Sequence, residues 1–334
     1  MDIPRPRALL RRVLTLAFVG SLAVSACGGT INTPTPGSLS PSPTSPAGCL
    51  PAPQGVNPDG WQSPSSAPPV IPQVISSDQV CGENRFLFGL LGSDNRSLAA
   101  PDRKVTVRFF DLGHDPTQPA ATADGTFLWA IDDVVGVYDL NVIFTSTGVW
   151  GAEFTTTDAS GANVSVRLTF VVVAHGSAVQ VGERAPASES RTLADVGGDL
   201  AKISSDTDPV ERFYTTSIAD AVAAHKPFVL VFATPAFCTS AQCGPTLDRL
   251  KPVAAAHPDV TVINVEPYEL TFEDGQLQPV RDAQGYLVPV AATLEWGLPS
   301  EPWIYVVDGD GMVRASFEGI VSEAELEAAV SAVE

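Results

Sequence analysis

The central stretch of this chain reads Val229-Leu-Val-Phe-Ala-Thr-Pro-Ala-Phe-Cys238-Thr-Ser-Ala-Gln-Cys243-Gly-Pro-Thr-Leu-Asp-Arg-Leu250. The apolar run at its start predicts a buried strand, and the pattern after Cys243 predicts a helix. Free N–H groups at a helix N-terminus carry partial positive charge, which favours a thiolate over a thiol. Two cysteines this close together form either a redox pair or a structural disulfide, and the spacing alone does not separate the two.

Length and charge set broad limits on function. The chain has 334 residues, which is room for about two domains. Its formal net charge is −19 at pH 7. That charge argues against nucleic-acid binding, which needs a basic face, and against electrostatic docking on anionic lipid.

The N-terminus carries the pattern of an export signal. Residues 1–12 are rich in arginine, and residues 13–26 are apolar but too short to span a bilayer comfortably. Val24-Ser-Ala-Cys27 resembles the bacterial lipobox. That resemblance implies a lipoprotein signal peptide over residues 1–26, lipidation of Cys27 and a lipid anchor on the extracytoplasmic face of the cell membrane. The alternative is an ordinary cleaved signal peptide followed by an incidental cysteine.

The segment 27–75 is rich in proline, serine and threonine, so we expect a disordered tether that holds the folded part away from the membrane. Export implies an oxidising compartment in which disulfides are permitted. With Cys27 lipidated and Cys238 paired with Cys243, simple arithmetic leaves Cys49 for Cys81 as a possible structural disulfide. Trp61 is expected to pack against the first domain.

In residues 76–175, apolar side chains recur at every second position. Val105, Val107 and Phe109 share one face, and the same alternation runs from Tyr138 to Phe144 and from Val164 to Val172. Turn residues separate these runs, which predicts an antiparallel β-sandwich. The strand from Tyr138 resembles those of immunoglobulin-like domains of bacterial envelope proteins. His114 and His175 are isolated, so no metal cluster is expected in this domain.

Residues 187–334 alternate between strand and helix patterns. Helices are expected over 218–225, 245–256 and 323–333, and strands over 227–232, 260–265, 303–307 and 312–317. This order, with the cysteine stretch and Glu301-Pro302-Trp303, resembles the thioredoxin-like family. The resemblance implies an α/β thioredoxin-like fold, a catalytic Cys238 and Cys243, and a cis Pro302 beside them.

The motif departs from the family pattern because C-x4-C replaces C-x-x-C. Residues i and i+5 of a regular helix are about 7.5 Å apart along the axis, and a disulfide needs Cα atoms within about 7 Å with converging side chains. Cys238 is therefore expected in the loop, with Cys243 beneath it and hydroxyls of Thr239 and Ser240 available to cap the helix.

Cys243-Gly-Pro-Thr246 resembles Cys-Gly-Pro-Cys with the last cysteine replaced, which makes Cys243 an alternative nucleophile. The match of the helix that begins at Pro245 favours Cys238. The candidates for a carboxylate that assists proton transfer, none of them supported by a motif, are Glu211, Asp220 and Glu266.

Three functions stay open. The resemblance implies a membrane-anchored thiol–disulfide oxidoreductase that acts on thiols or disulfides of envelope proteins without a cofactor. A non-catalytic binding module with a structural disulfide is the second. The third is a copper-handling chaperone, although such relatives need a late histidine and the last one here is His257. The long stretch 266–294 is expected to form a flap beside the cysteines.

Overall fold

The computed structural model describes residues 48–53, 60–61 and 68–334, all within the compact unit Pro43–Glu334. The expected signal peptide, Cys27 and most of the expected tether lie outside the described residues. Within them the chain is mostly β, with few helices. In the described part of the chain, no helix combines the length and the apolar character needed to cross a membrane.

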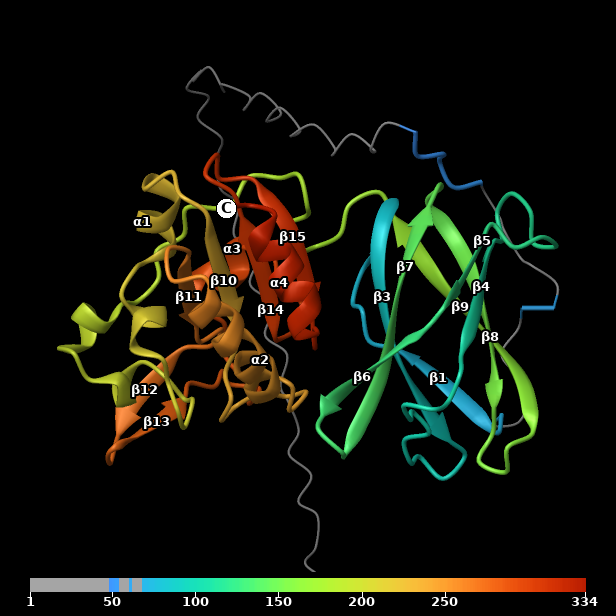
Figure 1. Cartoon of the computed structure of the whole chain (residues 1–334), viewed down its shortest axis with the longest axis horizontal. Coiled ribbons are helices and arrows are strands. Elements are labelled where there is room, and N and C mark those ends of the chain that lie inside the picture. Colours follow the sequence, from blue (N-terminus) through green and yellow to red (C-terminus); the bar gives the residue numbers. More distant parts are fainter. Residues whose placement is uncertain (1–47, 54–59, 62–67) are drawn as a thin grey trace, which may run out of the picture. The chain divides into compact units, whose positions relative to one another are not determined.

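The first part of the described chain is a sandwich of two sheets (Figure 1). Neighbouring strands are antiparallel throughout except β2 and β9, which are parallel. One sheet has the order β1 (Val70–Val74), β3 (Gly82–Gly92), β7 (Val135–Phe144), β6 (Thr126–Ile131). The other has the order β2 (Gln79–Val80), β9 (Asn163–Val173), β8 (Gly148–Thr157), β4 (Thr106–Asp111), β5 (Ala121–Asp124).

Alternate side chains of these strands meet in the middle of the sandwich. Tyr138, Leu140, Val142 and Phe144 of β7 all belong to its apolar core, together with Phe109 of β4 from the opposite sheet. Asn141 and Ile143, which alternate with them, are exposed, whereas Asp139 is buried. The predicted period of two and the predicted β-sandwich are thereby confirmed.

The expected tether ends earlier than residue 75. Residues 70–74 form β1, an edge strand paired with β3, so placing them in the tether was wrong. The segment is short and holds Pro72, which an edge strand tolerates because one of its sides makes no ladder bonds. Trp61 is buried against Phe110, as expected of a residue that packs on the first domain.

A disulfide joins Cys49 to Cys81 at the start of the sandwich. The backbone N–H of Leu50 donates to the carbonyl of Thr145, 3.0 Å away, so this segment is also held by main-chain hydrogen bonding. The bridge spans 32 residues of sequence and ties residues 48–53, which form an isolated β-bridge at Leu50, to Cys81 between β2 and β3.

The second part is built on a four-stranded sheet with the order β11 (Thr261–Val265), β10 (Phe228–Phe232), β14 (Trp303–Val307), β15 (Val313–Glu318). β10 is parallel to β11 and antiparallel to β14, and β14 is antiparallel to β15. The helices are α1 (Ile218–Ala223), α2 (Cys243–Ala256), α3 (Ala291–Glu295) and α4 (Glu323–Ser331), with short 3-10 turns η1 (Leu193–Val196), η2 (Leu200–Lys202) and η3 (Glu211–Tyr214).

Helices cover both faces of this sheet (Figure 1). Leu247 of α2 and Leu326 of α4 pack with Val231 on one face. Ile218 of α1 and Ala292 of α3 pack on the other face with Leu230 and its neighbours. β10 is buried at every residue because it is central and covered on both sides, as an unbroken apolar run requires.

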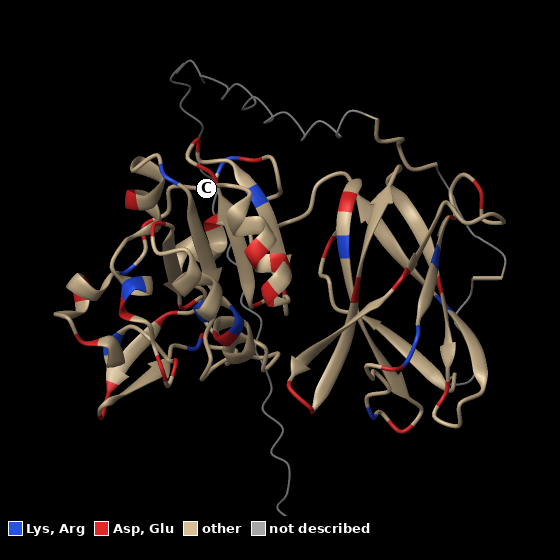
Figure 2. Ribbon diagram, in the orientation of Figure 1, with Lys and Arg blue, Asp and Glu red and all other residues tan. Residues whose placement is uncertain are grey.

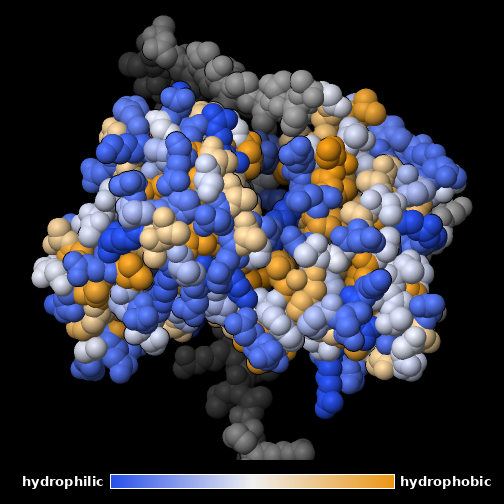
Figure 3. Space-filling view, in the orientation of Figure 1, coloured by the Kyte–Doolittle hydropathy of each residue, from blue (hydrophilic) through white to orange (hydrophobic). Residues whose placement is uncertain are grey.

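The surface is acidic and mixed in hydropathy. Figure 2 marks acidic residues in red along the ribbon of α4, which contains Glu323, Glu325 and Glu327. On the face drawn in Figure 3, hydrophobic residues form small groups among hydrophilic ones. Scattered exposed apolar residues of this kind are normal for a folded protein.

Candidate functional site

The two cysteines of the central stretch are joined at the junction of loop and helix. Cys238 lies in the loop after β10, and Cys243 is the first residue of α2. They form a disulfide with Cα atoms 6.0 Å apart. Because Cys238 lies outside the helix, the two cysteines can approach closely enough to bond, which two cysteines five residues apart in one regular helix could not do.

The two sulfurs differ in their access to solvent. Cys243 is fully buried in the core between α2 and the sheet. Cys238 is only partly buried. A partner molecule that approaches from solvent therefore meets Cys238 first.

The two hydroxyls expected at the start of α2 behave differently: Ser240 accepts the backbone N–H of the N-cap residue Gln242 at 3.4 Å, whereas Thr239 does not cap the helix. Thr239 donates its hydroxyl to Glu301, and the N-cap residue Gln242 makes no side-chain capping bond. The backbone N–H of Cys243 points instead at the Sγ of Cys238, 3.2 Å away. Capping by Thr239 was therefore a wrong prediction, because a buried acceptor from another part of the chain binds its hydroxyl.

That acceptor, Glu301, is the main residue that sequence reasoning missed. Glu301 is 5% exposed, and its carboxylate accepts the backbone N–H of Thr239 at 2.8 Å and the hydroxyl of Thr239 at 2.7 Å. Its backbone carbonyl accepts the hydroxyl of Ser240 at 3.1 Å. Glu301 thus holds the loop between the cysteines, and Pro302 follows it through a cis peptide bond.

The stretch 266–294 reaches the same place through Tyr268. The Tyr268 hydroxyl donates to the second oxygen of the Glu301 carboxylate. Burial raises the pKa of Tyr268, and the hydrogen bond to Glu301 raises it further, so the phenol keeps its proton. The rest of this stretch includes an antiparallel hairpin of β12 (Leu270–Glu273) and β13 (Gln276–Pro279).

Glu266 lies at the end of β11, beside the end of β10 from which the cysteine loop starts. Its Oε1 accepts the backbone N–H of Ser205 at 2.6 Å, and the Ser205 hydroxyl in turn accepts the N–H of Ala236 at 3.2 Å. Burial raises the pKa of Glu266 to about 7, although hydroxyls of Thr234 and Ser205 oppose the shift. Of the proposed carboxylates, Glu266 is the one that this network links to the cysteine loop.

The other two proposed carboxylates have different surroundings. Glu211 is exposed at the start of η3. Asp220 accepts the hydroxyl of Ser217, the N-cap residue of α1, at 2.7 Å. Neither is linked to the cysteine loop by a described contact, and Asp220 serves the helix terminus.

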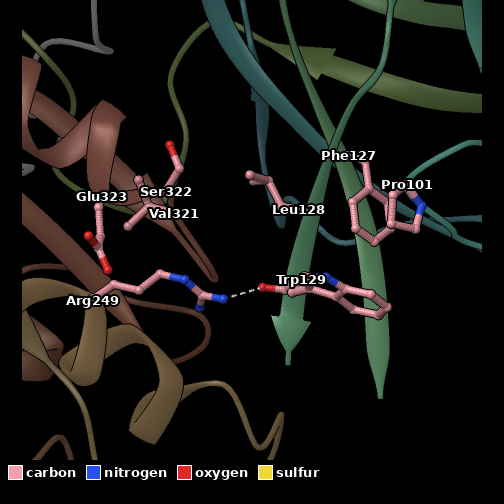
Figure 4. Close-up of a pocket in the computed structure, with 8 residues that line it drawn as sticks. All are labelled: Pro101, Phe127, Leu128, Trp129, Arg249, Val321, Ser322 and Glu323. Carbon is pink, nitrogen blue, oxygen red and sulfur yellow. Dashed lines mark hydrogen bonds between the residues drawn. The ribbon is translucent and has the colours of Figure 1, made fainter. Parts of the chain in front are cut away.

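The hollows among the described residues include one beside Arg249 and one beside Glu266. In the first, the Arg249 guanidinium points at the carbonyl of Trp129, 2.6 Å away (Figure 4). Neither cysteine lines it; the lining residues are Pro101, Phe127, Leu128, Trp129, Arg249, Val321, Ser322 and Glu323. The second includes Glu266 and Tyr268 among its lining residues and so adjoins the network described above.

Comparisons with known proteins add little to this geometry. No family model matches the chain, and no curated protein matches it. Among solved structures, the crystal structure of CopC from Methylosinus trichosporium OB3b is 13% identical, with a TM-score of 0.20. The likeness covers 30% of this chain and 86% of that chain.

Proposed function

We propose that this protein is a membrane-anchored, extracytoplasmic thiol–disulfide oxidoreductase that acts on protein cysteines through Cys238 and Cys243. The observation that carries the proposal is the asymmetry of the bridge. A partly exposed Cys238 is bonded to a fully buried Cys243 at the N-terminus of a 14-residue helix. One sulfur is open to attack, and the other leaves where helix N–H groups stabilise negative charge.

The sheet order supports a thioredoxin-like fold for residues 187–334. A parallel β10–β11 pair with α2 between its strands, followed by antiparallel β14 and β15 and a final helix, is the order that the sequence resemblance implies. Pro302 comes directly before β14, next to Glu301, which hydrogen-bonds the cysteine loop. For residues 76–175, the two-sheet sandwich is compatible with an immunoglobulin-like domain, to which we assign the role of a spacer or partner-binding platform.

The exchange proceeds by two displacements. A thiolate of the partner attacks the Sγ of Cys238, the Cys238–Cys243 bond breaks, and Cys243 leaves as a thiolate that then takes a proton. A second thiolate of the partner attacks its own sulfur in the mixed disulfide and releases Cys238. The partner is oxidised by two electrons, and the bridge is reduced to two thiols. The same steps in reverse reduce a partner disulfide, and the relative reduction potentials set the direction.

The proposal is tested by trapping the intermediate. In the full chain, Cys243→Ser leaves Cys238 without its resolving thiol, so a model protein disulfide should accumulate as a mixed disulfide on Cys238. Cys238→Ser is the matched control, because its remaining thiol is buried. Peptide mapping should show at least a tenfold excess of adduct for Cys243→Ser. If neither variant forms an adduct, the bridge is a structural element of a non-catalytic binding module.

A further inference from the structure

The cysteine pair and Glu301 together form a group of potential metal ligands. The two sulfurs and a carboxylate oxygen of Glu301 all lie within 4.8 Å of one another. Cys243 and Glu301 are buried, and Cys238 is partly exposed, so an ion would enter from the Cys238 side. The exchange chemistry proposed above makes no use of the Glu301 carboxylate.

Hydrogen bonds hold the Glu301 carboxylate in place and leave it able to accept one more ligand. A carboxylate offers about four lone pairs. Two hydrogen bonds from Thr239 and one from Tyr268 occupy three of them, which leaves one for another ligand. Such hydrogen bonds are typical of the outer shell that fixes a metal-binding carboxylate.

Reduction of the bridge creates a need for positive charge at this place. A phosphine supplies two electrons and is converted to its oxide, while the water that gives up its oxygen supplies two protons, so the disulfide becomes two thiols beside a buried carboxylate. If both thiols ionise, three negative charges are crowded within 4.8 Å, and in an environment of low dielectric this repulsion is costly. A divalent cation relieves the repulsion.

We propose that the reduced site binds Zn²⁺ through the Sγ atoms of Cys238 and Cys243 and a carboxylate oxygen of Glu301. Zn²⁺ accepts thiolate and carboxylate ligands together, and a water completes four-coordination. The ligand atoms of a tetrahedral zinc site lie about 3–4 Å apart, so small movements suffice. Cu⁺ prefers soft ligands and gains little from a carboxylate. Binding releases the two thiol protons, and the disulfide form, which has no thiolates, does not bind.

The test measures zinc binding by the full chain. The protein is reduced with a phosphine, freed of reductant under nitrogen and titrated with Zn²⁺ against a chromogenic chelator. We expect one ion more per chain for the reduced wild type than for reduced Cys238→Ser, and no such ion in the oxidised wild type. Glu301→Gln should weaken binding at least tenfold. The matched control is Glu273→Gln, which removes an exposed carboxylate from β12 and should change nothing.

Alkylation locates the ion independently. Bound Zn²⁺ should slow alkylation of Cys238 and Cys243 in the wild type at least tenfold, as read by mass spectrometry of the two peptides. No protection at these cysteines, or Glu301→Gln binding as tightly as wild type, would overturn the proposal. If Glu301→Gln does not fold, the alkylation of wild type alone decides. The mixed-disulfide experiment needs no metal, so the oxidoreductase proposal stands or fails separately.

Discussion

At the scale of single residues, Glu266 should make stability depend on pH. Its pKa is raised to about 7 in the folded protein, mainly by burial, from an ordinary value of 4.5. Below 4.5 the carboxyl is protonated in both the folded and the unfolded state. Between 4.5 and about 7 only the unfolded state releases the proton, so stability falls as pH rises.

The free energy of unfolding of Glu266→Gln, relative to that of wild type, should therefore be higher at pH 8 than at pH 4.5, by roughly 1–3 kcal/mol. Urea unfolding at the two pH values measures the difference. Glu211→Gln changes an exposed carboxylate on η3 and should show the same difference from wild type at both pH values. A gain for Glu266→Gln that does not change with pH would contradict the argument.

The residues of the candidate site were predictable to different degrees. Cys238 and Cys243 stand out in sequence because thiols at a strand–helix junction have a chemical meaning, and the structure brings them together. Glu301 does not stand out, because it lies 62 residues from the Thr239 that it binds. Only Pro302, which follows it, pointed to this part of the chain, and it did so through the family resemblance rather than through Glu301 itself.

At the scale of elements, the Cys49–Cys81 bridge should stabilise the sandwich. It closes a separation of 32 residues and adds a covalent link to the main-chain hydrogen bonds that hold Leu50. The double substitution Cys49→Ser and Cys81→Ser should lower the free energy of unfolding by about 2–4 kcal/mol, as urea denaturation would show. The same variant should leave the reactivity of Cys238 unchanged. A loss below about 0.5 kcal/mol would mean that the bridge does not restrict the unfolded chain.

Strands were predicted correctly where the apolar pattern extends over many residues, and they were missed where the patterned segment is short. Every second residue of β7 from Tyr138 to Phe144 enters the apolar core, and the five buried residues of β10 form an unbroken apolar run. β1 has five residues including a proline, and the short hairpin β12–β13 is mostly exposed. In such segments tertiary pairing, rather than local pattern, determines the structure.

At the scale of the whole molecule, the proposed lipid anchor predicts where the protein is found. Cys27 lies outside the described residues, so the expectation rests on the lipobox-like Val24-Ser-Ala-Cys27. Cys27→Ser should move the protein from the membrane fraction to the extracytoplasmic soluble fraction, since a lipid chain supplies the membrane affinity. Fractionation and immunoblotting measure this. Retention of Cys27→Ser in the membrane would contradict the anchor.

The central claim is that Cys238–Cys243 is a redox bridge, and its reduction potential tests this most directly. The full chain is equilibrated in thiol–disulfide buffers, its thiols are trapped and its peptides are mapped by mass spectrometry. Cys49–Cys81 serves as an internal reference for a structural bridge. We predict that the Cys238–Cys243 disulfide and its dithiol form interconvert with a reduction potential above about −270 mV, and that Cys49–Cys81 stays oxidised under the same conditions. A Cys238–Cys243 bridge that remains closed below about −300 mV would contradict the account.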